Sequence, residues 1–345
     1  MIECVITLDY EIYGNGRGSL REQVYEPAER LSAICRKRNC RFVVFVEVAE
    51  LEAIEAAQVD PYVEDVKRQV RSLLEEGFEV GLHIHPWWYN SSYRDGAWVL
   101  DYSEYNLCTL PQERIAAIID RSIAYLRSIL KKPDFSPISY RSGHLLFQPT
   151  STVARVLAQR GIKIDSSVYN GGLWRYQKQD YRKTQNNGYY WRFSDEVVVP
   201  DSQGGLLEVP IYTQMVPVWK MLTGKRIGLQ QKVVSAPVSQ SSVRLPRRIL
   251  DRARFFHPLK MDFCSMTIAE LTRMVDSVIL EDKRSPSIYR PIVAIGHTKD
   301  LVDLETVDQF LAYLGENGIG VSTFEQMYRS RVCGLSEHQM GAEAR

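Results

Sequence analysis

Short apolar runs alternate with segments of helical period along most of the chain. Residues 5–8, 42–46 and 78–82 are apolar or nearly apolar runs of strand length. Between them, residues 27–38 and 61–76 repeat their apolar side chains every three to four positions, which is the spacing of one helix face. Strands that alternate with helices in this way predict a parallel sheet covered by helices.

The alternation continues into the last third of the chain. Further helices are predicted at 111–131, 152–160, 267–280 and 304–315, and further strands at 138–141, 162–164, 197–199, 206–211, 260–263, 291–295 and 320–323. Thr267 and Glu270 have the spacing of a capping box. The repeat is close to that of a parallel α/β barrel, so we expect one domain over residues 1–330 and a disordered tail at 331–345.

Two segments interrupt this pattern. Residues 170–194 are rich in Gly, Asn, Gln and aromatic residues, which predicts loops with a small antiparallel insertion. Residues 220–254 are basic and poor in periodicity, and we predict a mobile flap there. Long loops on barrels commonly carry specificity.

Polar side chains of the catalytic type stand directly after several predicted strands. They are Asp9, Glu11, His83, His85, Arg141, Asp165 and His297. Residues at i and i+2 of a strand share a face, so Asp9 with Glu11, and His83 with His85, project together. Because the carboxyl ends of barrel strands converge, these side chains are expected at one mouth. Two imidazoles and a carboxylate with an open position form the ligand set of a hydrolytic zinc site.

The overall composition narrows the choice of partner and compartment. The chain has 43 basic and 42 acidic residues and a formal net charge of +1, which argues against nucleic acid or an anionic membrane surface as partner. Six scattered cysteines without a C-x-x-C pair predict reduced thiols. We find neither a signal-peptide pattern nor an apolar run of about 18 residues, and expect a cytoplasmic protein without a membrane span.

Five motifs, in order, give the chain a resemblance to the polysaccharide deacetylase (NodB-homology) family. They are Thr7-Leu8-Asp9-Tyr10-Glu11, Glu79-Val80-Gly81-Leu82-His83-Ile84-His85-Pro86, Tyr140-Arg141-Ser142-Gly143, Ile164-Asp165-Ser166-Ser167-Val168 and Val293-Ala294-Ile295-Gly296-His297. The resemblance covers about residues 1–330. It implies a single distorted (β/α)7-type barrel with loop insertions. It also implies a metal-dependent hydrolase, usually a zinc enzyme, that removes an acetyl group from an N-acetylated sugar or glycan precursor.

The resemblance also implies roles for four residues. Asp9 matches the general base, Arg141 the arginine that orients this base, and His297 the histidine that protonates the leaving amine. His83 matches the first metal-binding histidine. Amide hydrolysis needs an activated water, a Lewis acid at the carbonyl oxygen and a proton for the departing nitrogen, so this division of roles is chemically consistent.

The chain departs from the family pattern at two positions. The family has a second aspartate directly after the first, where this chain has Tyr10. In the family, the second metal-binding histidine comes four residues after the first, and this chain has Trp87 at that position. We interpret Glu11 and His85 as the replacement metal ligands, since each keeps the i, i+2 spacing. The alternatives are that Asp9 itself binds the metal, or that metal binding is weak and the chemistry is lost.

The same resemblance implies a carbohydrate substrate, and a nucleotide-linked or lipid-linked form of it is an alternative to the free sugar. Trp87 and Asp165 are the predicted substrate-binding residues, although an aromatic cluster such as the one at Trp87 is equally consistent with packing under a loop. The basic 220–254 segment is a candidate to face a phosphate or lipid-linked substrate. His144 is left outside the metal shell.

Three other functions compete with deacetylation. A glycoside hydrolase needs two carboxylates on opposite sides of the bond, for which Glu208 or Asp165 would have to serve as the distant partner of Asp9. The His-x-His motif alone also fits an amidohydrolase, but it would then be expected on the first strand rather than the third. The third alternative is a catalytically silent carbohydrate-binding protein.

Overall fold

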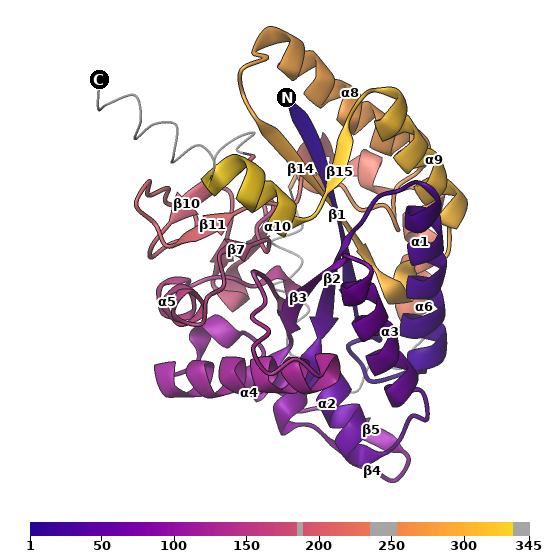
Figure 1. Cartoon of the computed structure of the whole chain (residues 1–345), viewed down its shortest axis with the longest axis vertical. Coiled ribbons are helices and arrows are strands. Elements are labelled where there is room, and N and C mark those ends of the chain that lie inside the picture. Colours follow the sequence, from indigo (N-terminus) through magenta and orange to yellow (C-terminus); the bar gives the residue numbers. More distant parts are fainter. Residues whose placement is uncertain (185–188, 235–253, 334–345) are drawn as a thin grey trace.

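A curled sheet of parallel strands forms the centre of the molecule (Figure 1). The computed structural model describes residues 1–184, 189–234 and 254–333. In spatial order the parallel strands are β14 (Arg290–His297), β1 (Ile2–Tyr10), β2 (Val43–Glu47), β3 (Glu79–Ile84), β6 (Ser139–Ser142), β7 (Ile164–Asp165) and β11 (Leu206–Glu208). Ile211, just after β11, bridges Val293 of β14, so the two edges of the sheet meet. The predicted distorted (β/α)7-type barrel is confirmed.

Helices cover the outer face of this sheet (Figure 1). They are α1 (Glu26–Lys37), α2 (Val48–Ala57), α3 (Val63–Glu75), α4 (Gln112–Leu130), α5 (Ser151–Gln159), α8 (Ile268–Arg284) and α9 (Leu304–Glu316). The short helix α10 (Phe324–Met327) packs instead on the apolar cluster inside the barrel. The predicted capping box is present, because the Thr267 hydroxyl accepts from the Glu270 amide and the Glu270 carboxylate accepts from the Thr267 amide. Helices α2 and α10 were not predicted, because they are short and follow directly after strands β2 and β15 (Gly320–Ser322).

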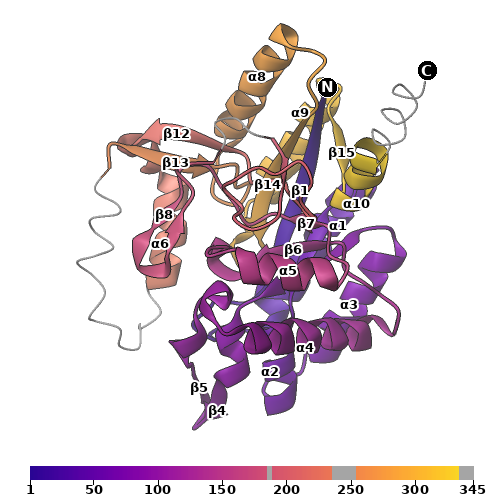
Figure 2. The same ribbon diagram turned by 90° about the vertical axis from the view of Figure 1, so that its left-hand side faces the viewer.

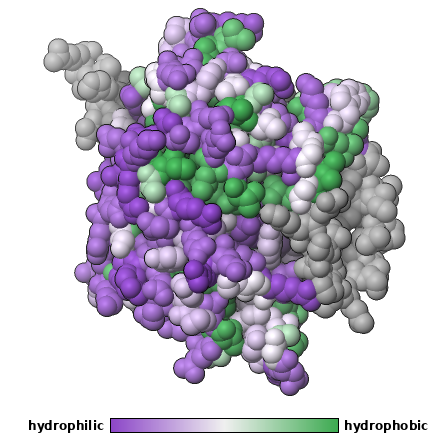
Figure 3. All heavy atoms as spheres, turned by 90° about the vertical axis from the view of Figure 1, so that its right-hand side faces the viewer, coloured by the Kyte–Doolittle hydropathy of each residue, from purple (hydrophilic) through white to green (hydrophobic). Residues whose placement is uncertain are grey.

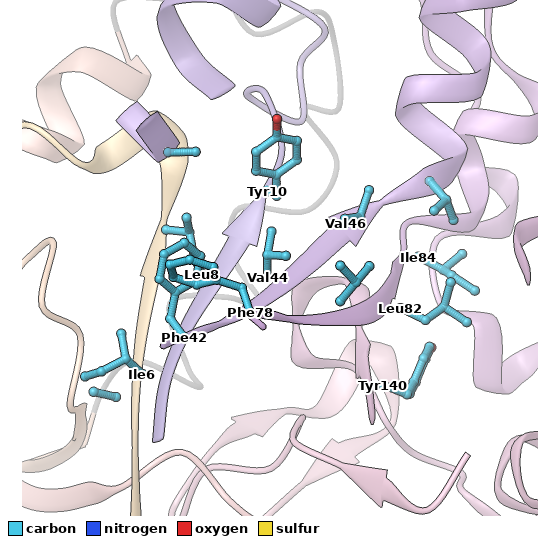
Figure 4. Packing of buried hydrophobic residues seen from close by; sticks show 14 of the residues in the cluster. Ile6, Leu8, Tyr10, Phe42, Val44, Val46, Phe78, Leu82, Ile84 and Tyr140 are labelled. Carbon is cyan, nitrogen blue, oxygen red and sulfur yellow. The ribbon is translucent and has the colours of Figure 1, made fainter. Parts of the chain in front are cut away.

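Alternation along the strands divides the apolar core into two layers. Ile6, Leu8 and Tyr10 of β1 lie in the layer between sheet and helices, together with the other labelled residues of Figure 4. Val5, in contrast, belongs to the cluster inside the barrel. Successive strand residues point to opposite faces, so Asp9 shares the inner face with Val5. The strand period therefore directs the polar ends of the strands into the barrel mouth.

Antiparallel hairpins and one helix make up the insertions. The pairs are β4 (Ser92–Arg94) with β5 (Ala97–Val99), β8 (Leu173–Trp174) with β9 (Gln179–Asp180), and β12 (Thr213–Pro217) with β13 (Phe256–Lys260). The β8–β9 hairpin confirms the small insertion predicted within 170–194. Helix α6 (Gly224–Val234) follows β12. No helix in the described ranges is long and apolar enough to cross a membrane.

Several local predictions differ from the structure, and parts of two others lie outside the described residues. Residues 197–199 form a turn, in which the Val199 amide donates to the Glu196 carbonyl, and β10 (Trp191–Phe193) supplies the strand beside β11. Residues 224–234 are helical rather than irregular, and the rest of the predicted flap, 235–253, lies outside the described residues. Strand β13 ends where the predicted strand at 260–263 was to begin. Residues 331–333 continue a π-helical segment, and the remaining predicted tail, 334–345, is outside the described residues.

Candidate active site

Polar side chains from five elements meet at the mouth of the barrel. We call this group the mouth cluster: Asp9, Glu11, Glu47, His83, His85, Arg141, His297 and Lys299. The strand register brings its members together, because Asp9 pairs with His297, Glu47 with His83, and His83 with Arg141. All of them come from the carboxyl ends of strands or from the residues just after, as predicted for a parallel barrel.

Asp9 is held between two basic side chains. One of its oxygens accepts a hydrogen bond from Arg141 Nη1 at 2.6 Å, and the other lies 3.5 Å from His297 Nε2. Burial disfavours the carboxylate, but Arg141, His83 and His297 outweigh burial and lower the pKa of Asp9. The carboxylate is therefore ionised at neutral pH. His297 keeps part of its ring exposed, so it links Asp9 to the solvent side of the mouth.

Arg141 is fixed on every side. Its Nε donates to the Ser166 carbonyl at 2.8 Å, and its Nη1 also donates to the Thr7 hydroxyl at 3.0 Å. The guanidinium lies over the Phe45 ring, with 4.3 Å between Cζ and the ring centroid. A fully buried guanidinium with these partners has one position only, and it sets the orientation of Asp9.

Glu11 divides its two oxygens between a lysine and the imidazoles. Oε1 accepts from Lys299 Nζ at 2.6 Å, whereas Oε2 lies 3.2 Å from His85 Nδ1 and 3.7 Å from His83 Nε2. Thr298 holds the main chain of Glu11, since its hydroxyl accepts from the Glu11 amide and donates to the Glu11 carbonyl. Burial opposes ionisation, but Lys299 and His85 outweigh it and hold the pKa of Glu11 well below its usual range. Oε2 is thus available as an ionised ligand atom.

The two histidines differ in which nitrogen is available. His83 Nδ1 donates to the Arg141 carbonyl at 2.8 Å, which directs Nε2 toward Glu11. His85 Nε2 instead accepts from the backbone amide of His144 at 3.2 Å, so a neutral His85 ring carries its proton on Nδ1. His85 can give Nδ1 to a cation only if that proton leaves and the contact with His144 changes. His83 is therefore the better prepared metal ligand of the two.

Glu47 is a member of the cluster that sequence reasoning missed. Its Oε2 lies 2.9 Å from His85 Nδ1, while Oε1 caps α2 by accepting from the amides of Ala49 and Glu50. Burial raises the pKa of Glu47 to about 8. The signal was present, because Glu47 directly follows the predicted strand 42–46. Lys299 was missed as well, although it stands two residues after His297.

The cluster fits a divalent cation. Glu11, Glu47, His83 and His85 can each place one ligand atom within 4.8 Å of all the others. Among the described residues, His83 Nε2, His85 Nδ1 and Glu47 Oε2 are buried there without a hydrogen bond. His85 Nδ1 and Glu47 Oε2 face each other at 2.9 Å, and His83 Nε2 faces Glu11 at 3.7 Å, but none of the three atoms makes a hydrogen bond, so a cation between them would give all three a partner. Imidazole and carboxylate donors are those that zinc takes in catalytic sites.

The two predicted substrate-binding residues are both fully buried, and Trp87 lies against the mouth cluster, with 4.4 Å between its ring centroid and that of His85. Trp87 is fully buried and stacks on Tyr105, with 5.0 Å between ring centroids. Asp165 is also fully buried and accepts from the Ser167 hydroxyl and amide. It follows Ile164, which points into the barrel, so its own side chain points to the opposite face, beside Glu208. The structure thus brings Trp87 against the mouth cluster at His85, but it turns Asp165 to the opposite face of the sheet.

Comparison with solved structures confirms the fold. The sequence matches no protein-family model and no curated protein. A protein from Mycobacterium smegmatis assigned to the polysaccharide deacetylases superposes with a TM-score of 0.53 at 13% identity, over 97% of this chain and 91% of that one. A second such protein, from Pseudomonas aeruginosa, superposes with a TM-score of 0.49 at 11% identity, over 96% of this chain and 92% of that one. An allantoinase superposes with a TM-score of 0.49 at 10% identity, over 96% of this chain and 91% of that one. The chain therefore has the fold of a polysaccharide deacetylase, as the motifs indicated.

Proposed function

We propose that this chain is a metal-dependent hydrolase that removes an acetyl group from an N-acetylated sugar or glycan precursor. The observation that carries the proposal is the mouth cluster, in which buried ligand atoms without a hydrogen bond lie beside an ionised aspartate and a partly exposed histidine. The deacetylase fold supports the choice of reaction. Zinc is the proposed metal, because the donors are imidazoles and carboxylates.

Glu11 and His83 would hold the ion, joined by Glu47 and by His85 once its Nδ1 is deprotonated. When bound, such an ion lowers the pKa of water and polarises an amide carbonyl. Asp9, ionised and oriented by Arg141, accepts the proton of the attacking water. His297 faces the other Asp9 oxygen and reaches the solvent side, so it delivers a proton to the departing sugar nitrogen. The products are acetate and the free amine.

The buried position of Asp165 and Glu208 weighs against the glycoside hydrolase. Both side chains are fully enclosed and lie against each other on neighbouring strands. Neither can stand across a glycosidic bond from Asp9, as a two-carboxylate mechanism needs. Acyl transfer at the mouth cluster needs no second distant carboxylate.

The substrate is proposed to be a carbohydrate, carried on a lipid or a nucleotide, and the compartment to be the cytoplasm. The cysteines at positions 4, 35, 40, 108 and 264 are buried free thiols, which supports a reducing compartment.

Acetate release tests the proposed function. Chelator-treated protein should release no acetate from N-acetylglucosamine oligomers until zinc or cobalt is added, and Asp9→Asn should abolish the restored activity. Metal content of Asp9→Asn separates the two roles of Asp9: a base leaves the bound metal in place, whereas a ligand does not. Equal activity with and without metal would contradict the mechanism. Stoichiometric metal without turnover of any N-acetylated sugar would favour the silent binder.

A further inference from the structure

A group of large apolar side chains is exposed at the tip of the β12–β13 hairpin and at the start of α6. We call it the tip patch: Met215, Val218, Trp219, Leu222, Phe255 and Phe256. Trp219, Phe255 and Phe256 are 56%, 59% and 50% exposed, and Leu222 is 69% exposed. The face drawn in Figure 3 has a band of hydrophobic surface across its middle and smaller hydrophobic areas near its top and bottom edges. Contiguous exposed apolar patches mark interaction surfaces.

The aromatic residues of the tip patch form one unit. The Val218 amide donates to the Phe255 carbonyl at 2.9 Å, and β12 pairs with β13 as far as Pro217 and Phe256. The Trp219 and Phe255 rings meet edge to face with 5.2 Å between centroids, and Phe255 meets Phe256 at 4.9 Å. The rings are therefore held outward by backbone pairing, and an accidental surface loop would not fix them in this way.

The hairpin and α6 carry basic residues and no acidic one, although the whole chain is nearly neutral. Residues 212–234 and 254–260 contain Lys220, Lys225, Arg226, Lys232, Arg254 and Lys260, and no acidic residue. Lys225 and Arg226 are paired with Asp303 and Glu270, which anchors the base of α6 to the barrel. Lys220 is exposed beside Trp219. Exposed aromatic side chains beside basic ones suit the boundary of an anionic lipid bilayer, where rings enter the headgroup layer and cations meet phosphates.

The hairpin joins this surface to the mouth cluster. Met261 and Phe263, directly after β13, bond to Ile295 of β14, two positions before His297. From Lys260 to Phe256 the strand spans about 13 Å at the usual rise per residue. In Figure 2, β12 and β13 lie on one side of the molecule, away from α2, β4 and β5. A flat surface against the tip patch would therefore lie near the mouth and leave the opposite side of the barrel free.

We propose that the tip patch docks this protein on anionic phospholipid bilayers as a peripheral membrane protein. The bilayer is favoured over a second copy of the chain because Lys220 is exposed beside the rings, and residues 212–234 and 254–260 hold no acidic residue that could pair with it across an interface between two copies. The docking does not depend on the deacetylase activity. It gives the proposed lipid-linked form of the substrate a physical basis, since such a sugar would be presented within reach of the mouth.

Vesicle flotation with the full chain tests the proposal. The protein should float with vesicles of phosphatidylcholine and phosphatidylglycerol but not with pure phosphatidylcholine, and high salt should weaken the binding. Trp219→Ser with Phe256→Ser should reduce the partition coefficient by at least about tenfold. Lys220→Gln should reduce it by a smaller factor. Val99→Ser, at a residue 55% exposed on β5, is the matched control and should bind as the wild type does.

Three outcomes would overturn the proposal. These are absence of binding to the anionic vesicles, equal binding to both vesicle types, and unchanged binding of the doubly substituted protein whose circular dichroism shows it folded. Sedimentation velocity without lipid tests whether a second copy of the chain covers the tip patch instead. A wild-type dimer that dissociates in the doubly substituted protein would assign the patch to a second copy and would also overturn the proposal. Bromine-labelled phosphatidylglycerol should quench wild-type tryptophan fluorescence more than that of Trp219→Phe. Equal quenching would place Trp219 away from the lipid.

Discussion

The mouth cluster and the tip patch place side chains in opposite ways: the first buries charged groups, and the second exposes apolar ones. In the mouth cluster, charged groups are buried and each ionised carboxylate has a cation beside it: Arg141 for Asp9 and Lys299 for Glu11. In the tip patch, by contrast, apolar rings are exposed to solvent. Both arrangements cost free energy in an isolated protein, so both indicate a function beyond folding.

The largest expected effect is at Arg141. Arg141→Met removes the cation from the buried Asp9 carboxylate, and we expect a loss of about 3–5 kcal/mol in the free energy of unfolding, measured by urea denaturation. The double variant with Asp9→Asn should recover most of this loss while staying inactive, because no uncompensated charge remains. A stable single variant would show that the pairing of charges in the mouth cluster is not what makes their burial tolerable.

Glu79 offers a buried carboxyl without a cation for comparison. It stands at the start of β3, where it accepts from the Ser139 hydroxyl and the Glu325 amide, and burial raises its pKa to about 7. Because the pKa is raised in the folded protein, the protonated carboxyl of Glu79 favours folding. Its contribution to the free energy of unfolding is complete below about pH 4.5 and is lost as the pH rises through 7. Relative to Glu79→Gln, the wild type should lose up to about 3 kcal/mol of unfolding free energy between pH 4.5 and 8. Parallel stability curves for the two proteins would refute this.

The two histidines of the mouth cluster are expected to contribute unequally to zinc binding. His83→Ala should weaken zinc binding about 10–100-fold, and His85→Ala should weaken it clearly less, because the His85 ring must first lose its Nδ1 proton and its contact with His144. Competition with a chromophoric chelator measures both affinities. The reverse order would show that the ring of His85 turns readily and that His83 is not the principal imidazole ligand.

The smallest effect is expected at the tip patch. Trp219→Ser should change the free energy of unfolding by no more than about 0.5 kcal/mol, because the side chain is mostly exposed. Trp88→Ser is the matched control, since Trp88 is buried in the core and its loss should cost about 3–5 kcal/mol. Similar losses in the two variants, measured by urea denaturation, would mean that Trp219 serves packing instead of docking.

The difference between the regions also explains what sequence reasoning reached. Asp9, Glu11, His83, His85, Arg141 and His297 were predicted to meet because strand period and strand direction are local rules whose results add up at one mouth. The face of Asp165 could not be predicted in the same way, because the strand that holds it has two residues and only the structure shows that Ile164 is the one pointing inward. The tip patch was missed because the overall charge of +1 conceals a basic hairpin, and because exposure of scattered apolar residues depends on tertiary structure.

The most direct test of the central claim is the position of a bound metal ion. A crystal of the protein with zinc, measured on both sides of the zinc absorption edge, should show an anomalous peak within roughly 2.0–2.2 Å of His83 Nε2 and a Glu11 oxygen, with Asp9 beside it. A peak elsewhere, or none at saturating zinc, would contradict the assignment of the mouth cluster as a catalytic metal site.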